Sequence, residues 1–308
     1  MSYRTIHQAH HHFGWDHSIP PVLHISPGET VEFEVMDASG GQLSATSTAA
    51  DVARLDFARV NPVTGPVFLE GAQPGDAVAV EILELEGSGW GWTAIIPGFG
   101  LLASDFPEPF LHISRYDADG VSFTGEIRIP FRPFPGTIGL APAEPGLHSV
   151  VPPREVGGNM DIRDLTRGAR LYLPVQVPGG LFSVGDTHAA QGDGEVCGTA
   201  IESPMRIRLR FDLVKGAGLR RPQFSLPDAP TRHVDGKGYH VTTGISPDLM
   251  QAAQDAVRDM IDYLGKEYQL EPPLAYALCS VAVDLRISEV VDAPNWVVSA
   301  YLPKSIFR

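Results

Sequence analysis

Short runs in which apolar and polar residues alternate, separated by glycine and proline, dominate the first two thirds of the chain. Clear examples are residues 30–35, 77–83 and 206–211. Alternation with a period of two is typical of antiparallel strands that bury one face. Glycine and proline, which number 32 and 27, place turns between these runs. The pattern predicts a mainly β fold, with β-sandwich or barrel modules built from short antiparallel strands.

Two of these runs follow the same kind of turn. Residues 26–31 and 73–78 each place Pro-Gly and an acidic residue directly before a strand. Proline fixes φ at the second position of a turn, and glycine accepts the positive φ that follows. Gly168 precedes another strand-like run without the proline. The repetition indicates related sheet modules.

The C-terminal part of the chain has a different pattern, which predicts helices. We expect Ser246 to cap a helix that has Pro247 at its first position and ends near Gly265. A second helix is predicted over 273–279 and a strand over 281–287, so this part forms an α+β lobe. The first helix has apolar residues at spacings of three and four, namely Leu249, Ala252, Ala256, Met260, Ile261 and Leu264.

A run rich in acidic side chains and glycine, residues 185–195, offers candidate metal ligands. Asp186 and His188 share one face of an extended strand, because side chains alternate along it. Gly192 and Gly194 would let Asp193 and Glu195 bend back toward the same point. Glu202 follows closely. A metal half-site is one interpretation, and a set of ordinary Asp-Gly turns is the other.

Length suggests how the chain divides. At about 100–200 residues per domain, 308 residues form two or three lobes. We expect an N-terminal β-sandwich lobe at 1–125, a β-rich lobe carrying the candidate metal site at 126–245, and the α+β lobe at 246–308. Any enzyme chemistry is then expected upstream of the α+β lobe.

Charge and hydropathy exclude several classes of partner. The net charge of −14 argues against binding DNA or RNA, because nucleic-acid binders concentrate positive charge. No window approaches the ~20 apolar residues that cross a bilayer, and the first residues contain no secretory signal. We therefore expect a cytoplasmic protein. Cys197 and Cys279 lie far apart, which indicates two reduced thiols rather than a disulfide or a zinc ribbon.

Six phrases together resemble the acetamidase/formamidase family, and they span nearly the whole chain. In chain order they are residues 15–21, 89–93, 132–136, 141–146, 157–161 and 185–195. The resemblance implies a metal-associated hydrolase that splits short amides such as formamide or acetamide into a carboxylate and ammonia. It also implies a homodimer or homotetramer and a divalent metal, either zinc or calcium. One histidine among carboxylates favours zinc, whereas carboxylates with Asn159 and carbonyl oxygens would suit calcium.

Amide hydrolysis needs a polarised carbonyl, a nucleophile and a proton for the departing amine. We expect the metal ligands to be Asp161, Asp186 and His188, with Glu202 as a further candidate. A carboxylate with a raised pKa should carry the proton, and the candidates are Glu144, in a loop stiffened by prolines, and Glu195. The residues expected beside the ligands or around the substrate are Asn159, Gln191, Asp193, Trp90 and Trp92.

Each of these residues also has an ordinary structural interpretation. Asn159 and Asp161 could form an Asx-turn, and Glu144 could be an exposed loop carboxylate. Trp90 and Trp92, which with Phe99 could wall a small pocket, could belong to a core. Cys197 could be assisted by Glu195 as a nucleophile, but a small buried residue is the expectation.

Two further functions remain open at this stage. The same acidic cluster could hold a structural calcium ion in a β-sandwich binding protein that activates no water. The chemistry could also be retained with a larger or heterocyclic amide as substrate, because fold and motifs do not fix specificity.

Overall fold

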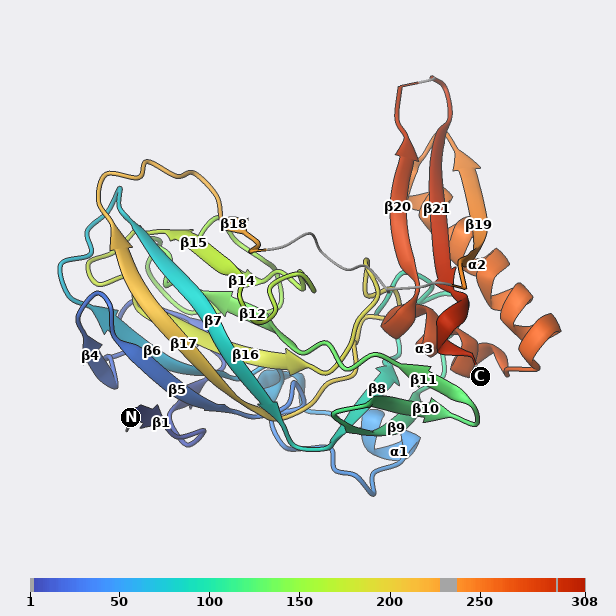
Figure 1. The fold of residues 1–308 in the computed structure, drawn as a ribbon, viewed down its shortest axis with the longest axis horizontal. Coiled ribbons are helices and arrows are strands. Elements are labelled where there is room, and N and C mark those ends of the chain that lie inside the picture. The colour runs from blue at the N-terminus through green and yellow to red at the C-terminus, as the bar shows by residue number, and fades with distance from the viewer. Residues whose placement is uncertain (1–2, 228–236, 292, 308) are drawn as a thin grey trace.

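The computed structural model describes residues 3–227, 237–291 and 293–307. Its architecture is mainly β, with the long helices near the C-terminus, as the sequence predicts (Figure 1). Two large sheets pack face to face and form a sandwich. A smaller sheet and the C-terminal helices and strands lie at one end of this sandwich.

The first sheet of the sandwich has the strand order β1-β5-β17-β7-β15-β18. All neighbours in it are antiparallel except β1 and β5, which run parallel. In chain order its strands are β1 (Arg4–Ile6), β5 (Thr30–Val35), β7 (Ala77–Gly87), β15 (Arg170–Pro174), β17 (Met205–Val214) and β18 (Gln223–Ser225).

The second sheet has the strand order β14-β12-β16-β6-β2, with β4 parallel to β6. β16 lies at its centre, between β12 and β6. In chain order its strands are β2 (His11–His12), β4 (Leu23–Ile25), β6 (Val63–Leu69), β12 (Phe134–Gly139), β14 (Gly157–Asn159) and β16 (Phe182–His188). Both sheets are open in the described part of the chain, so the sandwich alternative holds and the barrel alternative does not.

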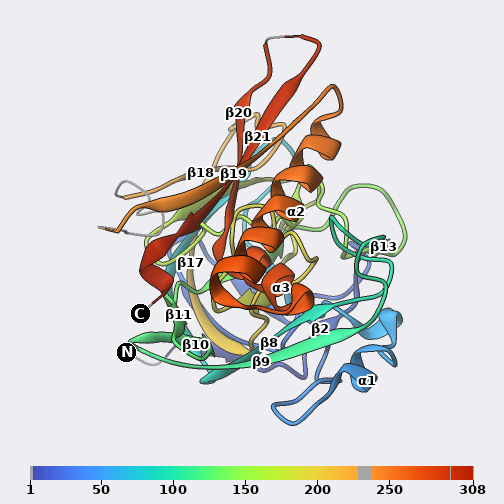
Figure 2. The ribbon, with the colours of Figure 1, turned by 90° about the vertical axis from the view of Figure 1, so that its right-hand side faces the viewer.

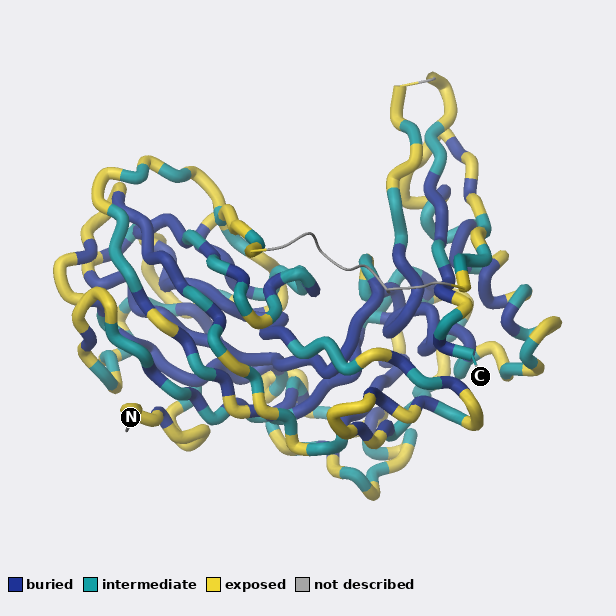
Figure 3. The backbone as a smooth tube through the Cα atoms, in the orientation of Figure 1, coloured by how far each residue is buried: buried dark blue, intermediate teal, exposed yellow. Residues whose placement is uncertain are grey.

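Alternating side chains of the two sheets fill the space between them. Phe33 of β5 and Phe211 of β17 meet Phe182 of β16, with ring centroids 5.8 Å and 4.9 Å from that of Phe182. All three rings are almost fully buried, and Figure 3 shows the buried backbone running through the sandwich. β5 and β17 bury one face, as the period-two alternation predicted, whereas β12 and β16 of the second sheet are buried along their whole length.

The rest of the molecule forms smaller units beside the sandwich. A sheet of order β11-β10-β9-β8 and a three-stranded sheet of order β19-β21-β20 make up most of it. Figure 2 shows α2 and α3 in front of the strands on this side. The bounds are β8 (Trp90–Ile95), β9 (Phe110–Asp117), β10 (Gly120–Thr124), β11 (Ile127–Ile129), β19 (Tyr239–Ser246), α2 (Leu249–Tyr268), α3 (Pro272–Ala282), β20 (Asp284–Glu289) and β21 (Trp296–Pro303).

Short elements complete the fold. β3 (Gly14–Trp15) pairs with β13 (His148–Ser149). α1 (Ala49–Val52) and a 3-10 turn over Phe57–Arg59 follow β5, and a second 3-10 turn covers Lys304–Ile306. None of the helices in the described ranges is both long and apolar enough to cross a bilayer.

Strands are predicted well by the local pattern. Residues 30–35 coincide with β5, and the other two example runs lie inside β7 and β17. The turn glycines Gly28 and Gly75 have φ values of 90° and 95°, as the Pro-Gly turns required.

Helix ends are predicted less well. Ser246 ends strand β19 and does not cap α2; Asp248 does, because its side chain accepts a hydrogen bond of 3.0 Å from the amide of Gln251. The helix also continues past Gly265 to Tyr268. α3 extends to Ala282, so the following strand starts at Asp284 rather than at 281.

The sheets do not follow the expected boundary at residue 125. Strands from both sides of that position form each sheet of the sandwich: β5 and β7 pair with β17, and β6 pairs with β16. The C-terminal unit begins with β19 at Tyr239, slightly before residue 246. The sandwich is therefore built from two stretches of chain that are far apart in sequence.

Candidate metal centre

The candidate ligands gather where β16 leaves the sandwich. Asp186 and His188 end this strand, which points toward β8 and the C-terminal unit (Figure 1). His188 forms an isolated antiparallel bridge to Glu202, and Glu202 forms another to Trp92 on β8. The bridges join the second sheet of the sandwich to the β8–β11 sheet, with the candidate ligands at the junction.

Five side chains converge on one point. Ligand atoms of Asp161, Asp186 and His188 lie within 4.8 Å of one another, and those of His188, Glu195 and Glu202 do so too. Nε2 of His188 lies 3.2 Å from Oδ1 of Asp186, 3.2 Å from Oε2 of Glu202 and 4.0 Å from Oε1 of Glu195. The metal-ligand candidates Asp161, Asp186, His188 and Glu202 are therefore brought together, with Glu195 beside them.

The backbone at the cluster is unusual. Asp161, Asp186 and Glu195 have φ values of 50°, 54° and 44°, and the neighbouring Asn61 has 52°. Residues other than glycine rarely adopt this left-handed backbone conformation, because it costs free energy. Where they do adopt it, they are concentrated at functional sites. Asp186 lies within strand β16 with His188, as the sequence predicts, but its own backbone is left-handed instead of extended.

Gln191 fixes the orientation of the His188 ring. Its side-chain oxygen accepts a hydrogen bond of 2.9 Å from Nδ1 of His188, and its amide nitrogen donates to the carbonyl of Asp161 at 2.8 Å. The proton of a neutral imidazole is thereby held on Nδ1. The lone pair of Nε2 then faces the carboxylates, which is the arrangement of a metal-binding histidine.

Polar neighbours hold the carboxylates. The amide of Ala200 donates to Oε1 of Glu202 at 2.8 Å. Oδ2 of Asp186 lies 3.2 Å from Oγ1 of Thr137 and 3.4 Å from Nδ2 of Asn61. One oxygen of each carboxylate is thus fixed, which leaves Oδ1 of Asp186 and Oε2 of Glu202 facing His188.

Three buried atoms at the centre of the cluster form no hydrogen bond with any residue that the structure describes: Oδ1 of Asp161, Nε2 of His188 and Oε2 of Glu202. Buried polar atoms are normally satisfied, so atoms left in this way need a partner that the protein does not supply. A divalent cation is a suitable partner, because carboxylate oxygens and an imidazole nitrogen are ligands that zinc accepts. The donor set therefore fits a metal ion.

Gly136 makes room for this arrangement. A Cβ atom at this position would lie 2.6 Å from Oδ1 of Asp161, 2.7 Å from the His188 ring and 2.8 Å from Oδ2 of Asp186. Any side chain would displace three candidate ligands at once. The edge of the Phe134 ring flanks His188, with centroids 4.9 Å apart.

Burial and crowding shift the protonation of the cluster. Burial and the charge of Asp186 raise the pKa of Asp161 to about 7, and burial raises the pKa of Glu202 to about 8 against the effect of His188. Burial and the Asp161 carboxylate raise the pKa of Glu195 well above its ordinary value. Burial disfavours the charged form of His188, but Glu202 and Asp186 outweigh it and raise the pKa of His188. A bound cation would replace these protons as the balancing charge.

A cavity of about 470 Å³ opens onto the cluster. Its polar floor consists of Asn61, Asn159, Asp161, Asp186, Glu195 and Glu202, and its walls are largely apolar, with Leu55, Phe57, Val60, Trp92, Ile96, Phe99 and Val151. A concave apolar pocket with a few convergent polar groups is the usual form of a small-molecule site.

The chain matches a known protein family over its whole length. Residues 2–150 and 146–308 match the sequence profile of the acetamidase/formamidase family. The chain belongs to this family. A formamidase from Methylophilus methylotrophus is 30% identical, over 96% of this chain and 89% of that protein. An acetamidase from Mycolicibacterium smegmatis is 31% identical, over 67% of this chain and 66% of that protein.

Solved structures of related proteins have the same fold. A gamma lactamase from Delftia acidovorans superposes with a TM-score of 0.90 at 29% identity, covering 97% of this chain and 89% of that one. An acetamidase from Yersinia enterocolitica gives a TM-score of 0.67 at 31% identity, covering 99% and 94%. The family resemblance found in the sequence is confirmed.

Two predicted residues lie apart from the cluster in this family member. Glu144 is exposed, and its backbone carbonyl accepts a hydrogen bond of 2.9 Å from His148. The structure does not bring its carboxylate to the candidate ligands. Asp193 turns away from the cluster to Arg163, whose Nε lies 3.2 Å from its Oδ1. Of the two acids that the glycines could bend back, only Glu195 reaches His188.

Of the remaining predicted residues, three lie at the site and one does not. Asn159 and Trp92 line the cavity, and the indole nitrogen of Trp92 donates to Asp37 at 3.0 Å. Trp90 is half-buried and packs beside Trp92 in a small hydrophobic cluster instead of lining the cavity. Gln191 holds His188, as described above.

Both thiols are buried, as the sequence predicts. Cys197 and Cys279 are free cysteines that are fully buried. Burial raises the pKa of Cys197 to about 11, and burial also raises the pKa of Cys279. A thiolate nucleophile would need the opposite shift.

Sequence reasoning missed Asn61 and Thr137. Nδ2 of Asn61 donates to Oδ1 of Asn159 at 3.0 Å, and Oγ1 of Thr137 lies 2.6 Å from the same oxygen. Together they hold Asp186 and Asn159. Asparagine tolerates a positive φ better than most residues, but nothing near Asn61 in sequence marks it as special.

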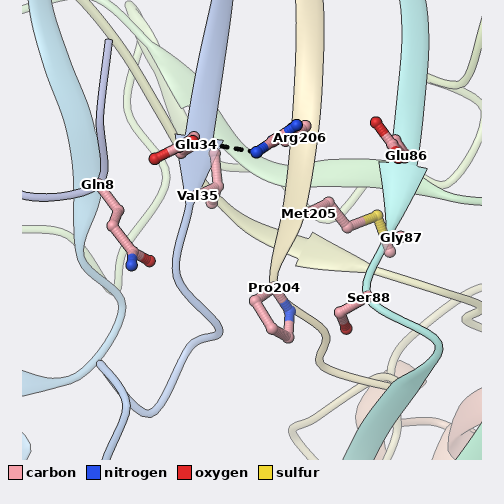
Figure 4. A pocket seen from close by; sticks show the side chains of 9 residues that line it. All are labelled: Gln8, Glu34, Val35, Glu86, Gly87, Ser88, Pro204, Met205 and Arg206. Carbon is pink, nitrogen blue, oxygen red and sulfur yellow. Dashed lines mark hydrogen bonds and ion pairs between the residues drawn. The ribbon is translucent and has the colours of Figure 1, made fainter.

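A second cavity, of about 310 Å³, lies at one end of the first sheet (Figure 4). Its lining includes Glu34, which pairs with Arg206 at 3.4 Å, and Glu86. Figure 4 shows these side chains at the ends of β5, β17 and β7. In the described part of the chain, both groups of residues that could hold a metal include His188. His188 does not line this second cavity, so the cavity has no candidate metal site among the described residues.

Proposed function

We propose that the protein is a metal-dependent amidohydrolase that cleaves short aliphatic amides, such as formamide and acetamide, to a carboxylate and ammonia. The observation that carries the proposal is the trio of unsatisfied buried atoms on Asp161, His188 and Glu202, two of which, Asp161 and Glu202, belong to residues that line a cavity. Membership of the acetamidase/formamidase family supplies the class of substrate.

Asp161, Asp186, His188 and Glu202 would hold the metal. Zinc is proposed over calcium, because His188 presents a nitrogen ligand and calcium sites use oxygen ligands. A divalent ion supplies a positive charge that polarises an amide carbonyl and acidifies water. Gln191, Ala200 and Thr137 keep the ligands in place by the hydrogen bonds described above.

Glu195 is the residue that moves the proton. Burial and the neighbouring Asp161 carboxylate raise its pKa well above the ordinary value, which suits a carboxyl group that has to hold a proton during the reaction. Its side chain is 17% exposed and lines the cavity, so it faces both His188 and the substrate. It takes a proton from attacking water and returns it to the departing nitrogen, so that ammonia leaves as a neutral molecule. Trp92 and Phe99 on the cavity wall limit access of other water molecules.

A larger or cyclic amide is a second candidate substrate. The cavity of about 470 Å³ lies in the range that holds drug-sized ligands, about 300–1,000 Å³. Formamide would fill little of it. In addition, the similar structure from Delftia acidovorans is named a gamma lactamase, and a lactam is a cyclic amide.

Ammonia release tests the proposal. The purified protein is stripped with a chelator, reloaded with zinc or with calcium, and incubated separately with formamide, acetamide, propionamide and a γ-lactam. The proposal predicts ammonia from at least one linear amide in the zinc-loaded protein and none after stripping. Ring opening of the lactam with no linear turnover would favour the second candidate. Stoichiometric calcium with no turnover of any amide would favour a binding protein that has a structural ion.

A further inference from the structure

A buried ion pair lies beside the loop that leads from His188 to Glu195. Nη1 and Nη2 of Arg163 contact Oδ1 and Oδ2 of Asp284 at 2.5 Å and 3.1 Å. Arg163 is 8% exposed and Asp284 is fully buried. A buried bidentate pair is a geometrically specific contact, but it adds little to stability because both charges lose their water. Its position therefore matters more than its strength.

Arg163 also contacts the loop that carries part of the cluster. Its Nη1 donates to the carbonyl of Gln191 at 3.2 Å, and its Nε lies 3.2 Å from Oδ1 of Asp193. Gln191 is the residue that orients His188, and Asp193 lies two residues before Glu195. Arg163 itself follows Asp161 by two residues. One guanidinium thus joins the segment of the candidate ligand Asp161 to the loop that carries Gln191 and Glu195.

Asp284 belongs to the C-terminal unit, at the start of β20. That unit binds the same loop through its backbone. The amide of Gly192 donates to the carbonyl of Ser280 at 2.8 Å, and the amide of Leu285 donates to the carbonyl of Asp193 at 2.9 Å. The amide of Asp193 donates to Oδ1 of Asp284 at 3.2 Å. A Cβ on Gly192 would lie 2.0 Å from the carbonyl oxygen of Val283, so the loop packs tightly on this unit.

We propose that Arg163 and Asp284 are positioning residues of the metal site, and that the C-terminal unit is part of the site's construction. This inference rests on the proposed metal-dependent function. Asp161 and Glu195 have left-handed φ values of 50° and 44°, which the surrounding structure must enforce. Arg163 supplies that constraint by tying both segments to Asp284. The expectation that the α+β lobe takes no part in the chemistry is then too simple.

Removing both charges tests the proposal, because it separates positioning from stability. Replacing one partner leaves a buried unpaired charge, whereas the double variant Arg163→Met/Asp284→Leu removes both charges of the buried pair, although the partly exposed Asp193 loses its contact with Arg163. We expect it to melt within a few degrees of the wild type but to bind zinc about 10–100-fold more weakly, the usual effect of losing support behind metal ligands. Zinc affinity is measured by competition with a chromophoric chelator.

A second bidentate pair, which is partly exposed, provides the control. Arg258 of α2 contacts Asp105 in the same bidentate way, at 2.6 Å and 3.0 Å, and also joins the C-terminal unit to the rest of the chain. Arg258→Met/Asp105→Leu should leave zinc affinity unchanged. Wild-type affinity in the Arg163/Asp284 variant, or an equal loss in the control, would overturn the proposal.

Hydrogen exchange of residues 191–198 gives a readout that needs neither metal nor substrate. The Arg163/Asp284 variant should exchange faster there than the wild type, both proteins being metal-free, and unchanged exchange would overturn the proposal. If the wild type failed to hydrolyse amides, the proposed function would fail while this readout still decided the role of the pair. Should the double variant not fold, Arg163→Lys takes its place, since lysine keeps the charge but loses the two-pronged contact; the same loss of zinc affinity is expected.

Discussion

His188 offers a metal ion one nitrogen atom, and its neighbours determine which one. Gln191 occupies Nδ1, so Nε2 is the atom that both candidate metal groups share. The carboxyl groups of Asp161, Asp186, Glu195 and Glu202 would bring four negative charges to this largely buried site if all of them were ionised. Such charges are stable only when they are protonated or balanced by a cation. At the scale of single residues, the cluster is therefore organised around one imidazole nitrogen.

Replacement of His188 by alanine should remove metal and activity together. The carboxylates lose the nitrogen that faces them, so we expect less than a tenth of the wild-type zinc content and a parallel loss of turnover. Elemental analysis and ammonia release measure the two quantities. His24→Ala, which alters an exposed histidine paired with Glu70, should change neither. Full activity in a preparation that elemental analysis shows to be free of metal would contradict the prediction.

Glu195→Gln should separate metal binding from catalysis. The amide cannot carry a proton, so we expect metal to be retained while kcat falls by about 10²–10⁴, the usual contribution of general acid–base catalysis. Glu144→Gln is the comparison, and it should keep wild-type turnover because Glu144 is exposed in its loop. If the Glu144 variant lost more activity than the Glu195 variant, the two roles would be reversed.

At the scale of elements, the cluster depends on how closely β12 approaches β16. The two strands pair in antiparallel register, with Phe134 opposite His188 and Thr137 opposite Gly185. Gly136 lies between these pairs and contacts the ligands without a side chain. The strand pairing therefore specifies the site as much as the ligands do.

Gly136→Ala should weaken the metal site without disturbing the sheet far away. The new methyl group would lie within 3 Å of Asp161, His188 and Asp186, and we expect zinc affinity to fall at least tenfold. Gly265→Ala is the control. Its Cβ would meet only the carbonyl of Leu270, at 3.6 Å, and alanine favours the helix by roughly 0.5–1 kcal/mol. Thermal unfolding of the Gly265 variant should show this gain in stability, and its zinc affinity should be unchanged. An unaltered zinc affinity in the Gly136 variant would contradict the prediction.

At the scale of the whole molecule, the buried acids link folding to pH. The pKa of Asp161 is raised to about 7 and that of Glu202 to about 8, whereas both ionise near pH 4 in an unfolded chain. A carboxyl with a raised pKa stabilises the fold below the unfolded value, and this stability is lost as pH rises through the folded value. His188, whose pKa is also raised, contributes with the same sign.

Metal-free protein should therefore melt several degrees lower at pH 8 than at pH 5.5, and zinc should reverse the difference. Differential scanning calorimetry of chelated and reloaded samples measures this. The Glu202→Gln variant, which removes one buried acid, should show a smaller dependence on pH. A melting temperature of the metal-free wild type that rises over this range would contradict the prediction. The lowered pKa of Asp186 acts only in acid and does not affect the comparison.

The sequence determined the features that depend on near neighbours. The strands β5, β7 and β17 follow from alternation, because each side chain's face is set by its parity along the strand. The nearness of Asp186, His188 and Glu202 follows from their short separation along the chain. By contrast, the prolines around Glu144 fix its backbone but say nothing about which way that loop faces.

Only the tertiary structure decided which distant residues share the site. Asn61 precedes β6, which pairs with β16, and Asp161 follows β14, which lies one strand beyond β12 on the other side of β16. This strand order brings both residues to Asp186, and no local sequence pattern predicts it. Asp193 and Glu195 both adjoin Gly194, but Asp193 pairs with Arg163 while Glu195 faces His188. Asp284, 121 residues from Arg163, pairs with it beside the loop that carries Gln191 and Glu195. Contacts at such separations depend on the order of strands and the packing of whole units, whereas local sequence encodes only periodicity, turns and the chemistry of each side chain.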